Sequence, residues 1–106
     1  MAFLHPEDMP ERRVGPVSYR IASAEPVMML HLTIPPDTYL PAHAHENFQL
    51  GYVLSGSATL SIGGETARVG PGMAYTIPAN VPHDLQTGDE PLELLDIYYP
   101  PKGDRL

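Results

Sequence analysis

Three histidines and one glutamine are the side chains of this sequence best suited to hold a metal ion. His43 and His45 lie two residues apart in the segment PAHAHENFQLGYVLSG, and Gln49 follows four residues after His45. In an extended chain, side chains two residues apart point to the same face, so both imidazoles would lie together. His83 lies far downstream, in the proline-bounded segment IPANVPHDL. The sequence therefore allows His43, His45, Gln49 and His83 to surround one divalent transition metal ion, with the alternative that Gln49 hydrogen-bonds a ligand or water.

The donor set of this predicted site limits its chemistry. The sequence contains no cysteine, so the ligands are nitrogen and oxygen. Imidazole binds Zn, Ni, Mn, Fe and Cu alike, so the histidines do not identify the metal. Because three neutral histidines and the amide of Gln49 carry no charge, the ion would keep its full double positive charge. Such a site favours an anionic ligand and Lewis-acid chemistry over redox turnover.

The elements that must position these residues are short strands. Val17, Tyr19 and Ile21 alternate with polar or small residues, as in a half-buried strand. Thirteen prolines and nine glycines leave no room for a helix of ordinary length, and the sequence predicts an all-β sandwich or barrel. The expected strands are 17–23, 27–34, 49–54, 57–62, 67–69, 73–77, 83–86 and 92–99.

Length and charge narrow the class of protein. A chain of 106 residues is the size of one domain, for which we assign residues 16–106. Residues 1–15 show no apolar period, and we expect a frayed terminus or an N-terminal arm in which Phe3 and Leu4 contact a dimer partner. The formal charge of −7 argues against nucleic-acid binding. Without a membrane-spanning run or a signal-like N-terminus, a cytoplasmic protein with no membrane partner is expected.

Two motifs of this sequence resemble those of the cupins, a family of double-sheet jelly rolls. The first cupin motif places His-x-His between two glycines, with a glutamate after the histidines. Here Asp37 occupies the first glycine position, Gln49 the glutamate position and Gly56 the last glycine position. Aspartate tolerates the left-handed turn conformation that glycine adopts. The resemblance covers residues 37–99 and implies a single-domain jelly-roll β-barrel.

The second cupin motif matches around the late histidine. Gly72, Pro78 and His83 stand at their expected positions, Asn80 takes a glycine position, and Thr87 replaces the usual asparagine. Both motifs appear in order and at the right separation, which makes the resemblance specific for the fold. It also implies a homodimer, because cupins commonly pair.

Within the cupins, this sequence is most similar to the pectin-degradation cupins, which convert 4,5-unsaturated monouronates to linear ketonised sugars. The features shared with that subgroup are the glutamine ligand, GYVLSG, IPANVPH and the ending LLDIYYPPKGDRL. The resemblance implies that Asp96, Tyr98 and Lys102 are catalytic. Tyr98 replaces the usual phenylalanine and Lys102 the usual arginine. Both departures concern the identity of the substrate more than the binding of the metal.

The side chains of these three residues are suited to acid–base catalysis on an anionic sugar acid. A carboxylate in the apolar run LLDIYY is costly to bury unless it is paired or neutralised, so Asp96 could act as a general acid or base. Tyr98 could be a second proton donor. Lys102 could bind a substrate carboxylate as a point charge.

The remaining candidate residues are expected to have no part in metal binding or catalysis. We assign neither His5 in the arm nor His31 in a core-like strand to the metal. Glu46 should point away from the site, and Tyr52 and Tyr75 are expected in the wall or core.

The function expected is thus a metal-dependent lyase- or isomerase-type enzyme acting on an unsaturated uronate or related sugar acid. The alternatives are a cupin dioxygenase or isomerase of another substrate, and a non-catalytic module that binds a small molecule. Leu95, Ile97 and Tyr99 share the outer face of the last strand and are the expected surface for a second subunit.

Overall fold

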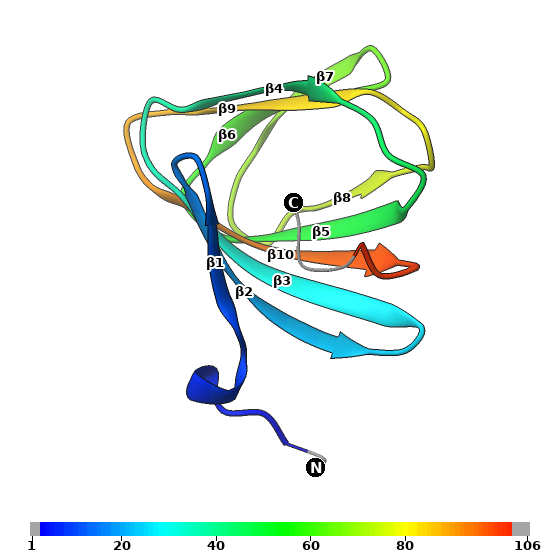
Figure 1. Ribbon diagram of the computed structural model, residues 1–106. Helices are drawn as coiled ribbons and strands as arrows, with labels where there is room; N and C mark the ends of the chain where they lie inside the picture. The colour runs from blue at the N-terminus through cyan, green and yellow to red at the C-terminus, as the bar shows by residue number, and fades with distance from the viewer. Residues whose placement is uncertain (1–2, 103–106) are drawn as a thin grey trace.

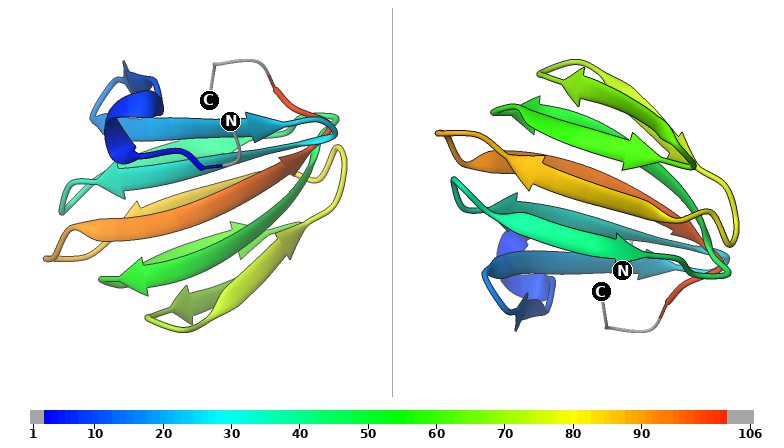
Figure 2. Two further views of the ribbon diagram at one scale, coloured as in Figure 1. Left: turned by 90° about the horizontal axis from the view of Figure 1, so that it is seen from below. Right: turned by 90° about the horizontal axis from the view of Figure 1, so that it is seen from above.

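The computed structural model describes residues 3–102, which fold into two antiparallel β-sheets that face each other (Figures 1 and 2). One sheet has the strand order β1-β2-β3-β10-β5-β8 and the other has the order β4-β9-β6-β7. The strands of the first are β1 (Glu11–Val14), β2 (Val17–Ala24), β3 (Val27–Ile34), β10 (Leu92–Tyr99), β5 (Phe48–Ser55) and β8 (Ala74–Ile77). Those of the second are β4 (Tyr39–His43), β9 (His83–Thr87), β6 (Ala58–Ile62) and β7 (Glu65–Val69).

The core lies between the two sheets and follows the period of two seen in the sequence. On β3, Met28, Leu30, Leu32 and Ile34 are buried, and their neighbours along the strand are more exposed. The expected all-β fold is confirmed, because the one helix among the described residues is a single 3-10 turn, η1 (Pro6–Asp8). No helix within residues 3–102 has the length and apolar character needed to cross a membrane.

Two turns show why glycine positions of the cupin motifs accept other residues here. Asp37 has φ of 53° and Asn80 has φ of 63°, so both adopt the left-handed conformation. Aspartate and asparagine reach this region more readily than other non-glycine residues. The amide of Asn80 donates a hydrogen bond to the carbonyl of His45 at 2.7 Å, which ties the turn before β9 to a candidate metal ligand.

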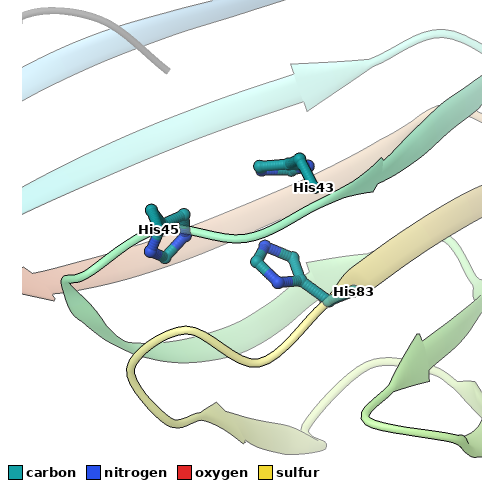
Figure 3. A group of neighbouring side chains, drawn as sticks. All are labelled: His43, His45 and His83. Carbon is teal, nitrogen blue, oxygen red and sulfur yellow. The ribbon is translucent and has the colours of Figure 1, made fainter.

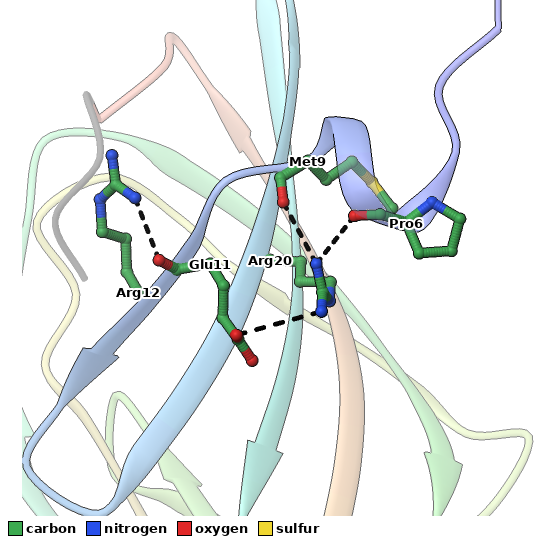
Figure 4. Close-up of polar contacts among 5 residues, drawn as sticks. All are labelled: Pro6, Met9, Glu11, Arg12 and Arg20. Carbon is green, nitrogen blue, oxygen red and sulfur yellow. Dashed lines mark hydrogen bonds and ion pairs between the residues drawn. The ribbon is translucent and has the colours of Figure 1, made fainter.

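Part of the N-terminal segment, which was expected to be an arm, is a strand of the six-stranded sheet. Residues 11–14, placed before the domain by the sequence, form the edge strand β1 and pair with β2. The guanidinium of Arg20 on β2 donates to the carbonyls of Pro6 and Met9, at 2.8 and 3.3 Å, and holds η1 against the sheet (Figure 4). Phe3 and Leu4 extend beyond this attachment and are exposed.

Candidate metal centre

The three predicted histidines meet at one end of the space between the sheets. His43 is the last residue of β4, His83 is the first residue of β9, and the two are direct cross-strand partners. His45 follows in the connection to β5. One ring nitrogen from each histidine lies within 4.8 Å of the others, a cluster found here among the described residues (Figure 3). Fixed ligands at this separation can share one metal ion.

Backbone carbonyls fix which nitrogen of each ring is free. The Nδ1 atoms of His43, His45 and His83 lie 3.3, 3.0 and 2.9 Å from the carbonyl oxygens of Pro41, Asn47 and Val81. A carbonyl only accepts hydrogen bonds, so each Nδ1 carries the proton and each Nε2 keeps its lone pair. Burial lowers the pKa of His45 and of His83, which favours the neutral form. Metal-binding histidines are commonly oriented in this way.

Gln49 adds an oxygen to the three nitrogens. It is buried on β5, and its Oε1 lies 3.1 Å from Nε2 of His45. With the proton of His45 on Nδ1, two lone pairs face each other, an arrangement that a shared cation stabilises. The amide group of Gln49 also hydrogen-bonds to the carboxyl group of Asp96. The predicted donor set therefore fits a divalent ion.

Asp96 lies beside this donor set and is almost fully buried on β10. Burial raises its pKa to about 6, although hydrogen bonds from Tyr75 and Gln49 and the charge of Lys102 oppose the shift. The hydroxyl of Tyr75 donates to Oδ1 of Asp96 at 2.6 Å. A carboxyl group with a pKa near neutrality can both take and return a proton, which is what a general acid–base requires.

Tyr98 and Lys102 complete the group predicted from the sequence. Tyr98 follows Asp96 by two residues on the same inward face of β10, and its ring contacts that of His45 with centroids 5.7 Å apart. Burial raises the pKa of Tyr98, so its hydroxyl stays protonated. The Nζ atom of Lys102 lies 4.9 Å from the centroid of the Tyr98 ring. Burial lowers the pKa of Lys102, whereas the charge of Asp96 raises it.

A cavity of about 60 Å³ opens beside the cluster and has two kinds of wall. By the rule of about 10–15 Å³ per enclosed water, it has room for a few water molecules or the reacting part of a ligand. Its polar wall contains His43, Gln49, Tyr75, His83, Asp84, Asp96 and Tyr98. The rest of the lining is aliphatic and consists of Leu32, Ile34, Leu40, Leu60, Ile77, Leu85 and Leu94.

The family model described as a cupin domain matches residues 19–98 of this chain. The chain belongs to the cupin family. A stretch of 59 residues of this cupin is 33% identical to the uncharacterised protein SCO3923 of Streptomyces coelicolor. That stretch spans 56% of each of the two chains, so it covers little more than half the length of the relative.

Solved structures show the same fold over nearly the whole cupin. An RmlC-like cupin from Shewanella frigidimarina aligns with a TM-score of 0.88 at 19% identity, covering 98% of this chain and 95% of that one. KdgF from Halomonas sp. aligns with a TM-score of 0.88 at 23% identity, covering 100% and 99%. The polyketide cyclase RemF from Streptomyces resistomycificus aligns with a TM-score of 0.81 at 27% identity, covering 95% and 80%.

The structure gives His31 and Tyr75 polar contacts that the sequence did not reveal, and it corrects the position expected for Tyr52. His31 points outward, where its Nε2 lies 2.6 Å from Oε2 of Glu93, and it is not part of the cavity. Tyr75 is in the core and lines the cavity, as expected, and its hydroxyl also donates to Asp96. An alternating strand pattern shows only that Tyr75 faces inward, and it does not reveal a partner on another strand. Tyr52 was expected in the wall or core as well, but it lies on the outer face of β5 and is exposed, which corrects that expectation. Glu46 is exposed, as predicted.

Proposed function

We propose that this cupin is a metal-dependent enzyme that opens the ring of a 4,5-unsaturated uronate or a related sugar acid. The observation that carries the proposal is the convergence of one ring nitrogen from each of three histidines and the oxygen of Gln49 beside the buried carboxyl group of Asp96. The likeness to KdgF, a pectin-degradation cupin, supports the substrate class through its architecture.

Each side chain has a defined task in this proposal. His43, His45, His83 and Gln49 would hold the ion, which would supply a Lewis acid for a substrate hydroxyl or carboxylate. Lys102 provides positive charge for the substrate carboxylate.

The reaction needs one proton to move between two atoms of the substrate. The anomeric hydroxyl loses its proton to Asp96 as the bond between C1 and the ring oxygen breaks, which leaves an aldehyde at C1 and an enolate at C5. Asp96 then returns the proton to C4, and the product is a linear ketone with the same atoms as the substrate. Tyr98, which stays protonated, is the alternative donor at C4. Both groups lie on one strand face next to the donor set.

The proposal is tested by measuring metal content and activity on the same sample. Elemental analysis identifies the bound metal, and 4,5-unsaturated galacturonate is then added while the absorbance of its conjugated double bond is followed. We expect the absorbance to fall faster than in buffer. The variant His31→Ala is the matched control and should keep both metal and activity. If a metal-loaded sample does not make the absorbance fall faster than in buffer, this function is excluded. Oxygen uptake by an iron-loaded sample would favour a dioxygenase instead.

The aliphatic wall of the cavity favours a second candidate. A sugar acid has hydroxyls on most of its ring atoms, whereas half of the residues that line the cavity are leucine or isoleucine. Such a wall suits an apolar substrate with several carbonyl groups, the kind of compound that a polyketide cyclase such as RemF acts on. The discriminating test compares α-hydrogen exchange of a simple 1,3-dione with uronate turnover on the same metal-loaded sample.

The outer face of the six-stranded sheet supports a homodimer. Phe48, Leu50 and Tyr52 on β5 are the cross-strand partners of Tyr99, Ile97 and Leu95 on β10, and Leu54 is a further exposed apolar residue on the same face of β5. None of these side chains is charged. A chain with a formal charge of −7 repels its own copies, so an uncharged apolar face is the place where two copies can meet.

A further inference from the structure

We propose that Tyr75 is a positioning residue of the metal centre, which acts through Asp96 to turn the amide oxygen of Gln49 toward the histidines. This inference rests on the proposed metal site. Tyr75 is not one of the four residues of the predicted donor set. Its influence passes through two hydrogen bonds, and the direction of each is set by chemistry.

The first step is the bond between Tyr75 and Asp96. The hydroxyl donates to Oδ1 of Asp96 over 2.6 Å, and both residues are buried. Asp96 is on β10 and Tyr75 is on β8, with β5 between them. A tyrosine that reaches across a whole strand fixes the orientation of the carboxyl group that it contacts.

Gly51 on β5 makes this reach possible. It is the cross-strand partner of both Asp96 and Tyr75, so the three residues form one row across β10, β5 and β8. A Cβ at Gly51 would lie 2.0 Å from Cζ of the Tyr75 ring and 2.4 Å from its hydroxyl oxygen. The ring therefore occupies the space that any other side chain at position 51 would fill.

The second step is the interaction of Asp96 with Gln49, where hydrogen bonding from Gln49 lowers the pKa of the carboxyl group. An ionised carboxylate has only acceptor atoms, so the side chain of Gln49 must offer its Nε2 hydrogens to Asp96. The amide is planar, and its oxygen then points the other way. That oxygen lies 3.1 Å from Nε2 of His45. If the amide turned over, a hydrogen-bond donor would face the lone pairs of the histidines, and the oxygen ligand would be lost.

The test is the affinity for Co²⁺, followed by its visible absorption, in a double-mutant cycle of Tyr75→Phe and Gln49→Ala. The phenylalanine keeps the ring over Gly51 and removes only the hydroxyl. We expect Tyr75→Phe to weaken Co²⁺ binding about tenfold and to change the absorption bands, as loss of a hydrogen bond behind a ligand commonly does. In the Gln49→Ala background, Tyr75→Phe should have no further effect, because no amide remains to be oriented.

Two further variants separate positioning from a general loss of structure. Tyr52→Phe removes a hydroxyl from an exposed tyrosine on β5 and should leave Co²⁺ binding unchanged. Gly51→Ala should weaken binding at least as much as Tyr75→Phe, provided that its circular dichroism remains that of the folded protein. Unchanged affinity in Tyr75→Phe, or an equal loss in both backgrounds, overturns the inference while leaving the metal site in place. Absence of Co²⁺ binding to the unmodified protein overturns the metal site as well.

Discussion

His43 and His83 stand opposite each other in the antiparallel strands β4 and β9, and their ring centroids lie 4.4 Å apart. Forty residues separate them in the chain, so this pair is created by the pairing of β4 with β9. The pairing register is irregular between Leu40 and His43, just before the site. One end of this sheet is thus shaped to bring two imidazoles together.

The first prediction concerns this pair. His43→Ala should weaken metal binding by more than about 100-fold, because even indirect support of a ligand is commonly worth 10–100-fold. Thermal melts should show the same effect, since a metal ion at 100 times its Kd stabilises the folded state by about 2.7 kcal/mol. The melting temperature of the unmodified protein should fall on addition of a chelator, and that of His43→Ala should not. Unchanged metal content in His43→Ala would contradict the whole assignment.

The second prediction concerns the charge at position 49. Gln49→Glu should keep the metal, because a carboxylate is a good ligand, but it lowers the net charge of the site and should reduce activity toward an anionic substrate about tenfold. It also places a carboxylate against Asp96, so the metal-free variant should melt at a lower temperature than the metal-free parent. Gln86→Glu adds the same charge at an exposed position of β9 and serves as the control. Full activity in Gln49→Glu would count against the neutral donor set.

The third prediction tests the role of Lys102 in substrate binding. Lys102→Gln should raise KM more than it lowers kcat, with a loss of about 10–100-fold in kcat/KM, the range expected for one charge-assisted hydrogen bond. Lys102→Arg keeps the charge and should retain most of the activity. Equal activity in all three proteins would show that the amine does not contact the substrate.

The fourth prediction concerns the turn after β5. Gly56 has φ of 80°, and a Cβ there would lie 2.1 Å from the carbonyl oxygen of Pro91. Gly64 has a similar φ of 89°, with nothing within 4 Å of the corresponding position. Gly64→Ala should therefore cost about 1–2 kcal/mol of unfolding free energy, for the backbone conformation alone. Gly56→Ala should cost at least about 1 kcal/mol more, for the overlap. Chemical denaturation of both variants measures the difference, and equal losses would refute the role of the Pro91 contact.

The fifth prediction tests the homodimer. Ile97→Glu places a charge in the middle of the apolar outer face and should convert a dimer to a monomer, as measured by sedimentation or light scattering. Thr59→Glu adds a charge to an exposed position of the other sheet and should leave the mass unchanged. A monomeric mass for the unmodified protein would remove this interface.

Local patterns in the sequence predicted most of the strands, the inward faces and the ligand types, because each depends on a few neighbouring residues. Alternation along the chain is enough to show that Asp96 and Tyr98 share the buried face of the last strand. Asp37 and Asn80 are residue types that tolerate the left-handed turn, and both adopt it. The strands β1 and β4 were not predicted, since nearly all of their residues are exposed and show no apolar alternation.

What only the tertiary structure decided is how residues on different strands meet. The carbonyls that turn the three histidine rings, the contact of Tyr75 with Asp96 and the approach of Lys102 to Tyr98 all depend on where the backbone runs and which strands lie side by side. Gly51 is the clearest case, because its lack of a side chain matters only once β8 lies beside β5. Strand pairing joins segments that are distant in the sequence, so no local pattern records it. The sequence alone therefore shows that the residue types for a metal centre are present. The register of the sheets determines whether these residues point toward one another.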